Sequence, residues 1–298
     1  MPADQLLESR DVPLGGLRGL TVHRTLPQRA IPTIGAWCFV DHFGPTTESM
    51  AVLPHPHTGL QTVTWPIAGQ IRHRDSLGSD VVLRPGELNL MTSGDGVAHS
   101  EFSVGDPEAP MHGIQLWVAL PEATRTGPAD FEHVTDLPQV EGPCWSGLVI
   151  VGSLAGRTSP ARTHTPLVGA QLSVKAGRAE IPVDPSFEHG VLAVDQDVHV
   201  AGESVPHRQL QYLAPGRDSI VVESDVDTTV LLIGGEPFEE DIVMWWNFIG
   251  RSHEEIAAAR VDWEDAAERF GRVEGHGDQV IPAPPMPEVR IKPRRRES

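Results

Sequence analysis

Most of the chain before residue 240 consists of short apolar or alternating runs, which Gly, Pro, Asn and Asp interrupt at intervals of roughly 8–12 residues. Residues 60–65, 88–91 and 111–120 are examples, and each has the length and composition of one buried strand. The 29 glycines and 27 prolines supply frequent turns. Many short strands joined by tight turns predict an all-β fold of antiparallel barrels or sandwiches.

This strand pattern occurs twice. It fades across residues 124–146 and resumes from residue 147 to about residue 240. We therefore expect two β-barrels of one type, in domains that span residues 1–130 and 131–240. Within the first barrel, Ala68-Gly69-Gln70 has the composition of a turn, so the runs before and after it are expected to pair as a hairpin.

Residues 241–298 have a different character and form a third segment. Ser252 and Glu255 have the spacing of a capping box, which predicts the start of a helix. We expect the helix to end at Gly271 and a basic, Pro-rich tail to follow it. One face of this helix would be apolar and buried: Ile256, Ala259, Trp263, Ala266 and Phe270.

Two short motifs carry the chemistry. His55 and His57 form a His-x-His pair, and His99 and Glu101 form a His-x-Glu pair. On a β-strand, residues i and i+2 point to the same face, so each pair directs two donors to one side of a sheet. If the two strands are neighbours, three imidazoles and one carboxylate converge as the ligands of a metal.

Other histidines lack such a partner. His42 follows Asp41 at the end of an apolar run, while His73 and His112 stand alone on predicted strands. We expect a structural role for His42 and a structural or surface role for His73, and His112 has no partner with which to form a ligand pair. Neither motif occurs in the second half of the chain, so the second barrel is expected to hold no metal.

Three neutral imidazoles and one carboxylate suit a divalent first-row transition metal, such as iron, nickel, copper, manganese or zinc. Four protein ligands leave an octahedral metal two open positions for a substrate or for dioxygen. The alternative is a closed site that only stabilises the fold.

Composition limits the classes of partner that the protein can bind and indicates its cellular compartment. Acidic residues outnumber basic ones 41 to 23, for a formal net charge of −18, which argues against nucleic-acid binding. No apolar run approaches the roughly 20 residues of a membrane span, and the two cysteines, Cys38 and Cys144, are far apart. We expect a cytoplasmic protein without a disulfide framework. We also expect a monomer, because two barrels can cover each other's apolar faces.

The sequence resembles the pirin family of the cupin superfamily. The usual cupin motif has a glutamate four or five residues after His-x-His, where this chain has Gln61 and Thr62; the carboxylate is instead at Glu101, as in pirins. The second half fits the family more loosely, chiefly through its strand spacing, Pro215-Gly216 and Gly234-Gly235-x-Pro237. The resemblance covers most of the first 121 residues, through Asp41-His42-Phe43-Gly44, His55-Pro56-His57, Gly59, Thr62, Gly69, His73, Asp75-Ser76, Gly78, Pro85-Gly86, Met91, Gly94, Gly96, His99-Ser100-Glu101, Gln115-Leu116-Trp117 and Leu120-Pro121.

The resemblance implies a bicupin: two antiparallel β-barrels of the double-stranded β-helix type, with a C-terminal helix. It also implies one metal in the N-terminal barrel, usually iron, with nickel, copper, manganese and zinc as alternatives. The metal ligands would be His55, His57, His99 and Glu101.

Members of the family are described either as quercetin 2,3-dioxygenases or as iron-dependent regulators without enzymatic activity. Our leading hypothesis is a metal-dependent dioxygenase that combines dioxygen with a flavonol (quercetin-like) or related enol substrate. Glu101 would be the catalytic base that accepts the hydroxyl proton.

Two alternatives remain. One is a redox-sensitive iron protein that binds a protein partner, and the other is a vestigial structural bicupin. A substrate-sized cavity that leads to the metal favours the enzyme over the regulator.

Overall fold

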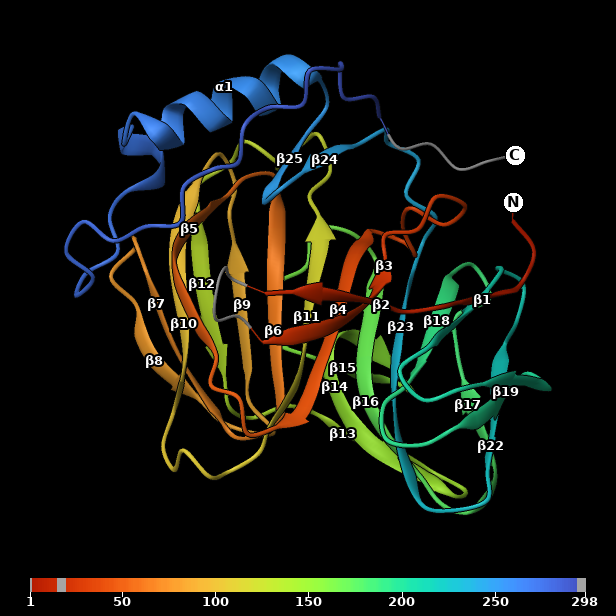
Figure 1. The fold of residues 1–298 in the computed structure, drawn as a ribbon. Helices are drawn as coiled ribbons and strands as arrows, with labels where there is room; N and C mark the ends of the chain where they lie inside the picture. The colour runs from red at the N-terminus through yellow and green to blue at the C-terminus, as the bar shows by residue number, and fades with distance from the viewer. Residues whose placement is uncertain (1, 15–19, 294–298) are drawn as a thin grey trace.

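The computed structural model describes residues 2–14 and 20–293, and within them the chain forms five antiparallel sheets, one α-helix and one short 3-10 helix (Figure 1). The predicted all-β class is confirmed. Each half of the chain contributes one large and one four-stranded sheet. The two halves lie side by side, and the C-terminal helix crosses the end of the first half.

The first half contains a seven-stranded and a four-stranded sheet. The larger sheet has the order β12 (Asp130–Val134), β9 (Leu88–Thr92), β6 (Leu60–Ala68), β11 (Met111–Ala119), β4 (Trp37–Thr46), β3 (Thr21–Leu26) and β2 (Arg10–Pro13). The smaller sheet has the order β5 (Ala51–His57), β10 (Val97–Val104), β7 (Gln70–Asp75) and β8 (Asp80–Leu83).

The hairpin expected around Gly69 is absent, and that prediction was wrong. β6 pairs with β9 and β11 in the larger sheet, whereas β7 pairs with β8 and β10 in the smaller one. Gly69 has φ +80°, and a Cβ there would lie 2.4 Å from Sδ of Met111. The chain therefore turns a corner between two sheets at a position that only glycine fits easily.

The second half repeats the arrangement. Its larger sheet has the order β1 (Gln5–Leu7), β21 (Leu210–Leu213), β18 (Glu188–Ala193), β23 (Thr228–Gly235), β16 (Leu167–Val174), β14 (Trp145–Leu154) and β13 (Gln139–Gly142), with β15 (Arg157–Thr158) paired to β14. Its smaller sheet has the order β17 (Gly177–Pro182), β22 (Ser219–Ser224), β19 (Val198–Val200) and β20 (Glu203–Val205). β1 thus crosses from the start of the chain into the second half, and the predicted domain limits remain a prediction.

The two larger sheets pack against each other through an apolar core. It includes Val63, Leu116, Leu192 and Ile233, all at most 1% exposed. The indole N–H of Trp37 on β4 also donates to the carbonyls of two strands of the second half, at 3.1 Å each. Both sheet faces are therefore excluded from water, and their apolar side chains stabilise the pair of halves.

The C-terminal segment starts with a small hairpin, β24 (Val243–Trp245) and β25 (Phe248–Gly250), followed by α1 (His253–Glu264) and a 3-10 turn, η1 (Glu268–Phe270). Ser252 caps the helix by accepting a hydrogen bond from the backbone N–H of Glu255 at 3.2 Å, as the capping box predicts. No helix among the described residues is long and apolar enough to cross a membrane.

The predicted helix end at Gly271 was wrong, because α1 stops at Glu264. Ala266 has φ +53°, a left-handed conformation that ends the helical path. Phe270 is nevertheless buried, with its ring 5.6 Å from that of Trp263. Of the five residues predicted on the buried face, four are buried, but Ala266 is exposed. The periodicity did not predict the turn that brings Phe270 back.

The described part of the tail lies against α1. Arg290 forms an ion pair with Glu254, and the backbone N–H of Ile291 donates to Nδ1 of His253 at 3.2 Å. The rest of the predicted basic tail, residues 294–298, lies outside the described residues.

Candidate metal centre

β5 and β10 are neighbouring antiparallel strands, which fulfils the geometric condition for convergence of the two motifs. His55 lies directly opposite His99, and His57 lies opposite Val97. A register shift between His99 and Glu101 places Glu101 opposite Val52. Both histidine-bearing strands belong to the four-stranded sheet, and their side chains point toward the seven-stranded sheet that faces it.

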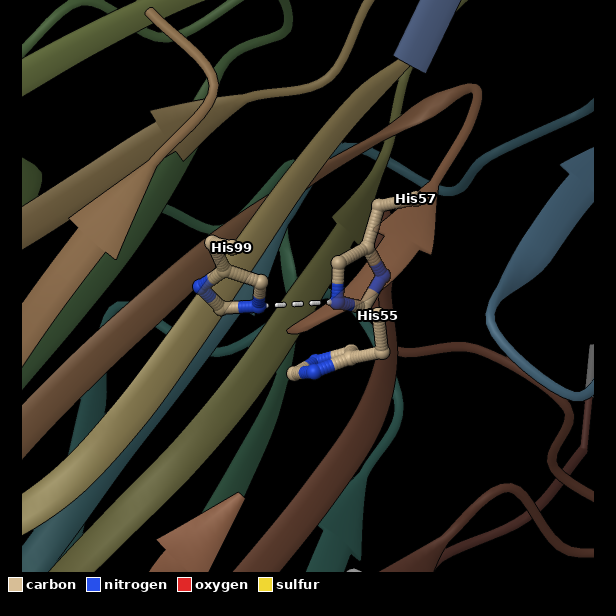
Figure 2. Close-up of side chains that lie close together, drawn as sticks. All are labelled: His55, His57 and His99. Carbon is tan, nitrogen blue, oxygen red and sulfur yellow. Dashed lines mark hydrogen bonds between the residues drawn. The ribbon is translucent and has the colours of Figure 1, made fainter. Parts of the chain in front are cut away.

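The imidazoles of His55, His57 and His99 converge on one point (Figure 2). Nε2 of His57 lies 3.0 Å from Nε2 of His99, and the rings of His55 and His99 have centroids 4.4 Å apart. One nitrogen from each of the three rings lies within 4.8 Å of the others. All three side chains are buried.

Burial determines the charge of these rings. Desolvation lowers the pKa of His55 to about 4, and it lowers the pKa values of His57 and His99 well below their ordinary value. The rings are therefore neutral at pH 7. Nδ1–H of His55 donates to the carbonyl of Leu53 at 2.9 Å, so its Nε2 keeps the free lone pair that a metal requires.

Glu101 lies beside the three imidazoles. It groups within 4.8 Å with His99 and with a further histidine, His73. Desolvation raises the pKa of its carboxyl, and the hydroxyl of Thr64, from the facing sheet, donates to Oε1 at 2.9 Å. The structure therefore places the three predicted histidine ligands together and the predicted carboxylate next to them.

His73 is a member of this centre that neither motif predicted. Its side chain is 1% exposed, its Nδ1 lies 3.3 Å from Nδ1 of His99, and its Nε2 lies 3.0 Å from Oδ2 of Asp75. Its ring stacks on Phe131 at 4.4 Å. A signal was present in the sequence, because His73 and Asp75 have the same i, i+2 spacing as the two ligand motifs.

His42 and His112 contact each other instead of the centre. Their Nε2 atoms lie 2.7 Å apart, and neither residue lines the cavity at His55. Asp41, the neighbour of His42, does line it, because successive residues of β4 face opposite sides of the sheet.

The donor set fits a transition metal. Such a site needs neutral imidazoles and a carboxylate that converge, and a neighbour that fixes the orientation of the ligands, which His73 provides for His99. Without a cation, lone pairs of His57 and His99 would face each other unless one nitrogen carried a proton. The residues that would hold the metal are His55, His57, His99 and Glu101.

A cavity of about 500 Å³ opens onto the centre. Its walls come from both sheets of the first half and from the loop between β24 and β25. Its lining combines apolar and aromatic side chains with charged and polar ones. The lining includes Arg10, Arg24, Phe39, Asp41, Phe43, Met50, Val52, Gln115, Trp117, Trp245, Trp246 and Asn247.

The fold and the centre define a two-domain cupin protein with a histidine-rich site in its N-terminal half. Residues 19–118 match the pirin family, and residues 170–271 match the pirin C-terminal cupin domain. The chain belongs to the pirin family, as its resemblance implied.

Individual relatives agree with this assignment. The chain is 44% identical over 288 residues to a Pseudomonas aeruginosa protein with the provisional name quercetin 2,3-dioxygenase, a match that covers 95% of this chain and 90% of that protein. It is 33% identical to a pirin-like protein of Caulobacter vibrioides, covering 96% and 99%. A crystal structure of a quercetin 2,3-dioxygenase from Acinetobacter baumannii superposes with a TM-score of 0.92, at 39% identity and 98% coverage of both chains.

Proposed function

We propose that this protein is a metal-dependent dioxygenase that acts on a flavonol or a related enol. The observation that carries the proposal is the cavity of about 500 Å³ with the histidine centre in its wall. Ligand pockets for small molecules commonly have about 300–1,000 Å³ and mainly apolar walls. The names of the relatives from Pseudomonas aeruginosa and Acinetobacter baumannii support the same reaction class.

His55, His57, His99 and Glu101 would bind the metal, with iron expected first and nickel, copper, manganese or zinc as alternatives. When bound, the metal would supply Lewis-acid activation of the enol and a site for dioxygen chemistry. The aromatic walls would hold a flat substrate in one orientation, which lowers the entropic cost of reaching the reactive geometry.

Glu101 is proposed as the base. One of its carboxylate oxygens accepts the hydrogen bond from Thr64, and the other has no hydrogen-bond partner among the described residues. That second oxygen is available to accept the hydroxyl proton of a bound enol. Thr64 would hold the carboxylate in place during the transfer.

The cavity favours the enzyme over a regulator that binds a protein partner through its surface. A regulator requires an exposed face that responds to the metal, whereas the three histidines are at most 7% exposed and face an internal space.

Oxygen uptake with quercetin tests the proposal. The protein is stripped of metal, reloaded with iron, nickel, copper or manganese, and assayed for metal content. We expect uptake and loss of flavonol absorbance only in reloaded protein. His55→Ala should lose bound metal and turnover together, while His164→Ala, in the second half, should keep both. Full turnover by metal-free protein would contradict the proposal.

A further inference from the structure

One wall of the cavity carries two guanidinium groups that no predicted role accounts for. Arg10 on β2 and Arg24 on β3 are direct cross-strand partners, and both line the cavity. Like charges in this position destabilise a sheet. Burial first, and then the charge of Arg24, lower the pKa of Arg10, and the carboxylate of Asp41 offsets part of this shift.

A single carboxylate offsets this charge. Asp41 is 1% exposed, and its two oxygens accept hydrogen bonds from Nε and Nη2 of Arg24, both at 2.7 Å. The bidentate pair satisfies Asp41. The same carboxylate attracts Arg10 at longer range, but no carboxylate among the described residues accepts a hydrogen bond from Arg10. Arg10 forms one hydrogen bond, from Nη1 to the carbonyl of Pro27 at 3.1 Å.

Both arginines therefore keep donors for a ligand. Nη1 of Arg24, and Nε and Nη2 of Arg10, have no hydrogen-bond partner among the residues that the structure describes. A guanidinium with two free N–H groups matches the oxygens of a carboxylate or sulfonate.

Aromatic rings connect this wall to the metal centre. The guanidinium of Arg24 lies 4.2 Å over the ring of Phe39, which stacks on Trp117 at 4.0 Å between centroids. Trp117 in turn meets the ring of His57 edge-on at 5.2 Å. Arg24, Phe39 and Trp117 line the same cavity as the histidines, so a ligand whose enol faces the histidines can reach the arginines within it.

The two arginines contrast with the charge of the rest of the protein. With a formal net charge of −18, the chain as a whole repels anions. We infer, on the basis of the proposed dioxygenase function, that the substrate carries a carboxylate or sulfonate at the end opposite its enol, and that Arg10 and Arg24 bind this group.

The test compares quercetin with quercetin 5′-sulfonate in iron-loaded protein. A sulfonate is a weak metal ligand, so its effect reports on the arginines and not on the metal. We expect a lower KM for the sulfonate in the wild type. Arg10→Gln should reduce the ratio of KM for quercetin to KM for the sulfonate about fivefold, because a partly exposed charge-assisted hydrogen bond to the sulfonate is lost.

Two further variants serve as controls for the charge of Arg10. Arg10→Lys should restore part of the preference for the sulfonate. Arg157→Gln removes the same charge from the exposed strand β15 and should leave the ratio as in the wild type. Equal ratios in wild type and Arg10→Gln, or an equal loss in Arg157→Gln, would overturn the inference.

A binding measurement distinguishes failure of this inference from failure of the proposed function. If neither compound is oxidised, the proposed function fails, and quenching of tryptophan fluorescence then measures affinity directly. Tighter binding of the sulfonate that depends on Arg10 would still support the inference. Equal binding of the two compounds, or no binding of either, would overturn it.

Discussion

His73 and His99 face each other through their Nδ1 atoms, 3.3 Å apart, and this contact fixes which nitrogen of His99 is free. If His99 uses Nε2 for the metal, its Nδ1–H donates to Nδ1 of His73, and Nε2–H of His73 then donates to Oδ2 of Asp75, 3.0 Å away. Oδ1 of Asp75 accepts from the backbone N–H of Leu77 and Ser79. Every donor in the chain of hydrogen bonds has an acceptor.

The pKa of Asp75 supports this assignment of donors and acceptors. Although burial alone would raise the pKa of Asp75, hydrogen bonds from His73 and Ser79 hold it below its ordinary value. Asp75 is therefore an anion at neutral pH, and it stabilises the N–H of His73 that points to it.

We predict that His73→Phe weakens metal binding. The substitution keeps a ring next to Phe131 but removes the acceptor for Nδ1–H of His99, so affinity should fall about 10- to 100-fold. Competition with a chelator, followed by metal analysis, measures the change. His199→Phe, at an exposed position on β19, is the control. Unchanged affinity in His73→Phe would show that His99 binds the metal without the hydrogen bond to His73.

We predict that Glu101→Gln separates metal binding from turnover. Glutamine keeps an oxygen that can accept from Thr64, but it is not a base, so kcat with quercetin should fall about 100-fold or more. The three imidazoles should still retain the metal. Metal content and oxygen uptake are measured on the same sample. A variant with normal kcat per bound metal would exclude Glu101 as the base.

We predict that removal of the helix cap costs stability. Ser252→Ala deletes the oxygen that accepts from the backbone N–H of Glu255, so the free energy of unfolding should fall by about 1 kcal/mol. Urea denaturation measures it. Ser204→Ala, at an exposed position on β20, should change it by less than about 0.5 kcal/mol. Equal effects of the two substitutions would contradict the capping role.

We predict that His189 makes stability depend on pH. It is 1% exposed and neither ring nitrogen has a hydrogen-bond partner among the described residues, so burial lowers its pKa to about 4. Between pH 6.5 and 4 the unfolded chain binds a proton that the folded protein does not, so stability falls as pH decreases through this window.

Urea unfolding at pH 7 and pH 5 measures the effect of His189 on stability. The loss in the free energy of unfolding between pH 7 and pH 5 should be smaller in His189→Leu than in the wild type by about 2 kcal/mol. His199→Leu, at an exposed position, should leave the loss as in the wild type. If His189→Leu and the wild type lose the same stability, His189 does not titrate in this range.

The sequence predicted much of the centre because strand geometry is local. The same-face rule for residues i and i+2 paired His55 with His57, and His99 with Glu101, without knowledge of the fold. It did not specify that β5 and β10 are neighbours, because some 40 residues separate them and pairing depends on both sheets. The family resemblance supplied that connection.

The errors have a shared physical origin. Around Gly69, composition predicted a turn, but nothing local distinguishes a hairpin from a corner between two sheets. At Ala266, helical spacing continued after the helix had ended, since burial of Phe270 against Trp263 needs only proximity. His73 was assigned no role in the centre because its partner, His99, belongs to another strand.

The pairing of β1 with β21 has a consequence for synthesis. Gln5 lies opposite Tyr212, and Asp4 accepts from the backbone N–H of Ala214 and pairs with Arg217. β1 therefore has no partner strand until about two hundred further residues have been synthesised. Completion of the second half, and not of the first, secures β1, so a nascent chain stopped near residue 130 leaves β1 unpaired and open to other chains.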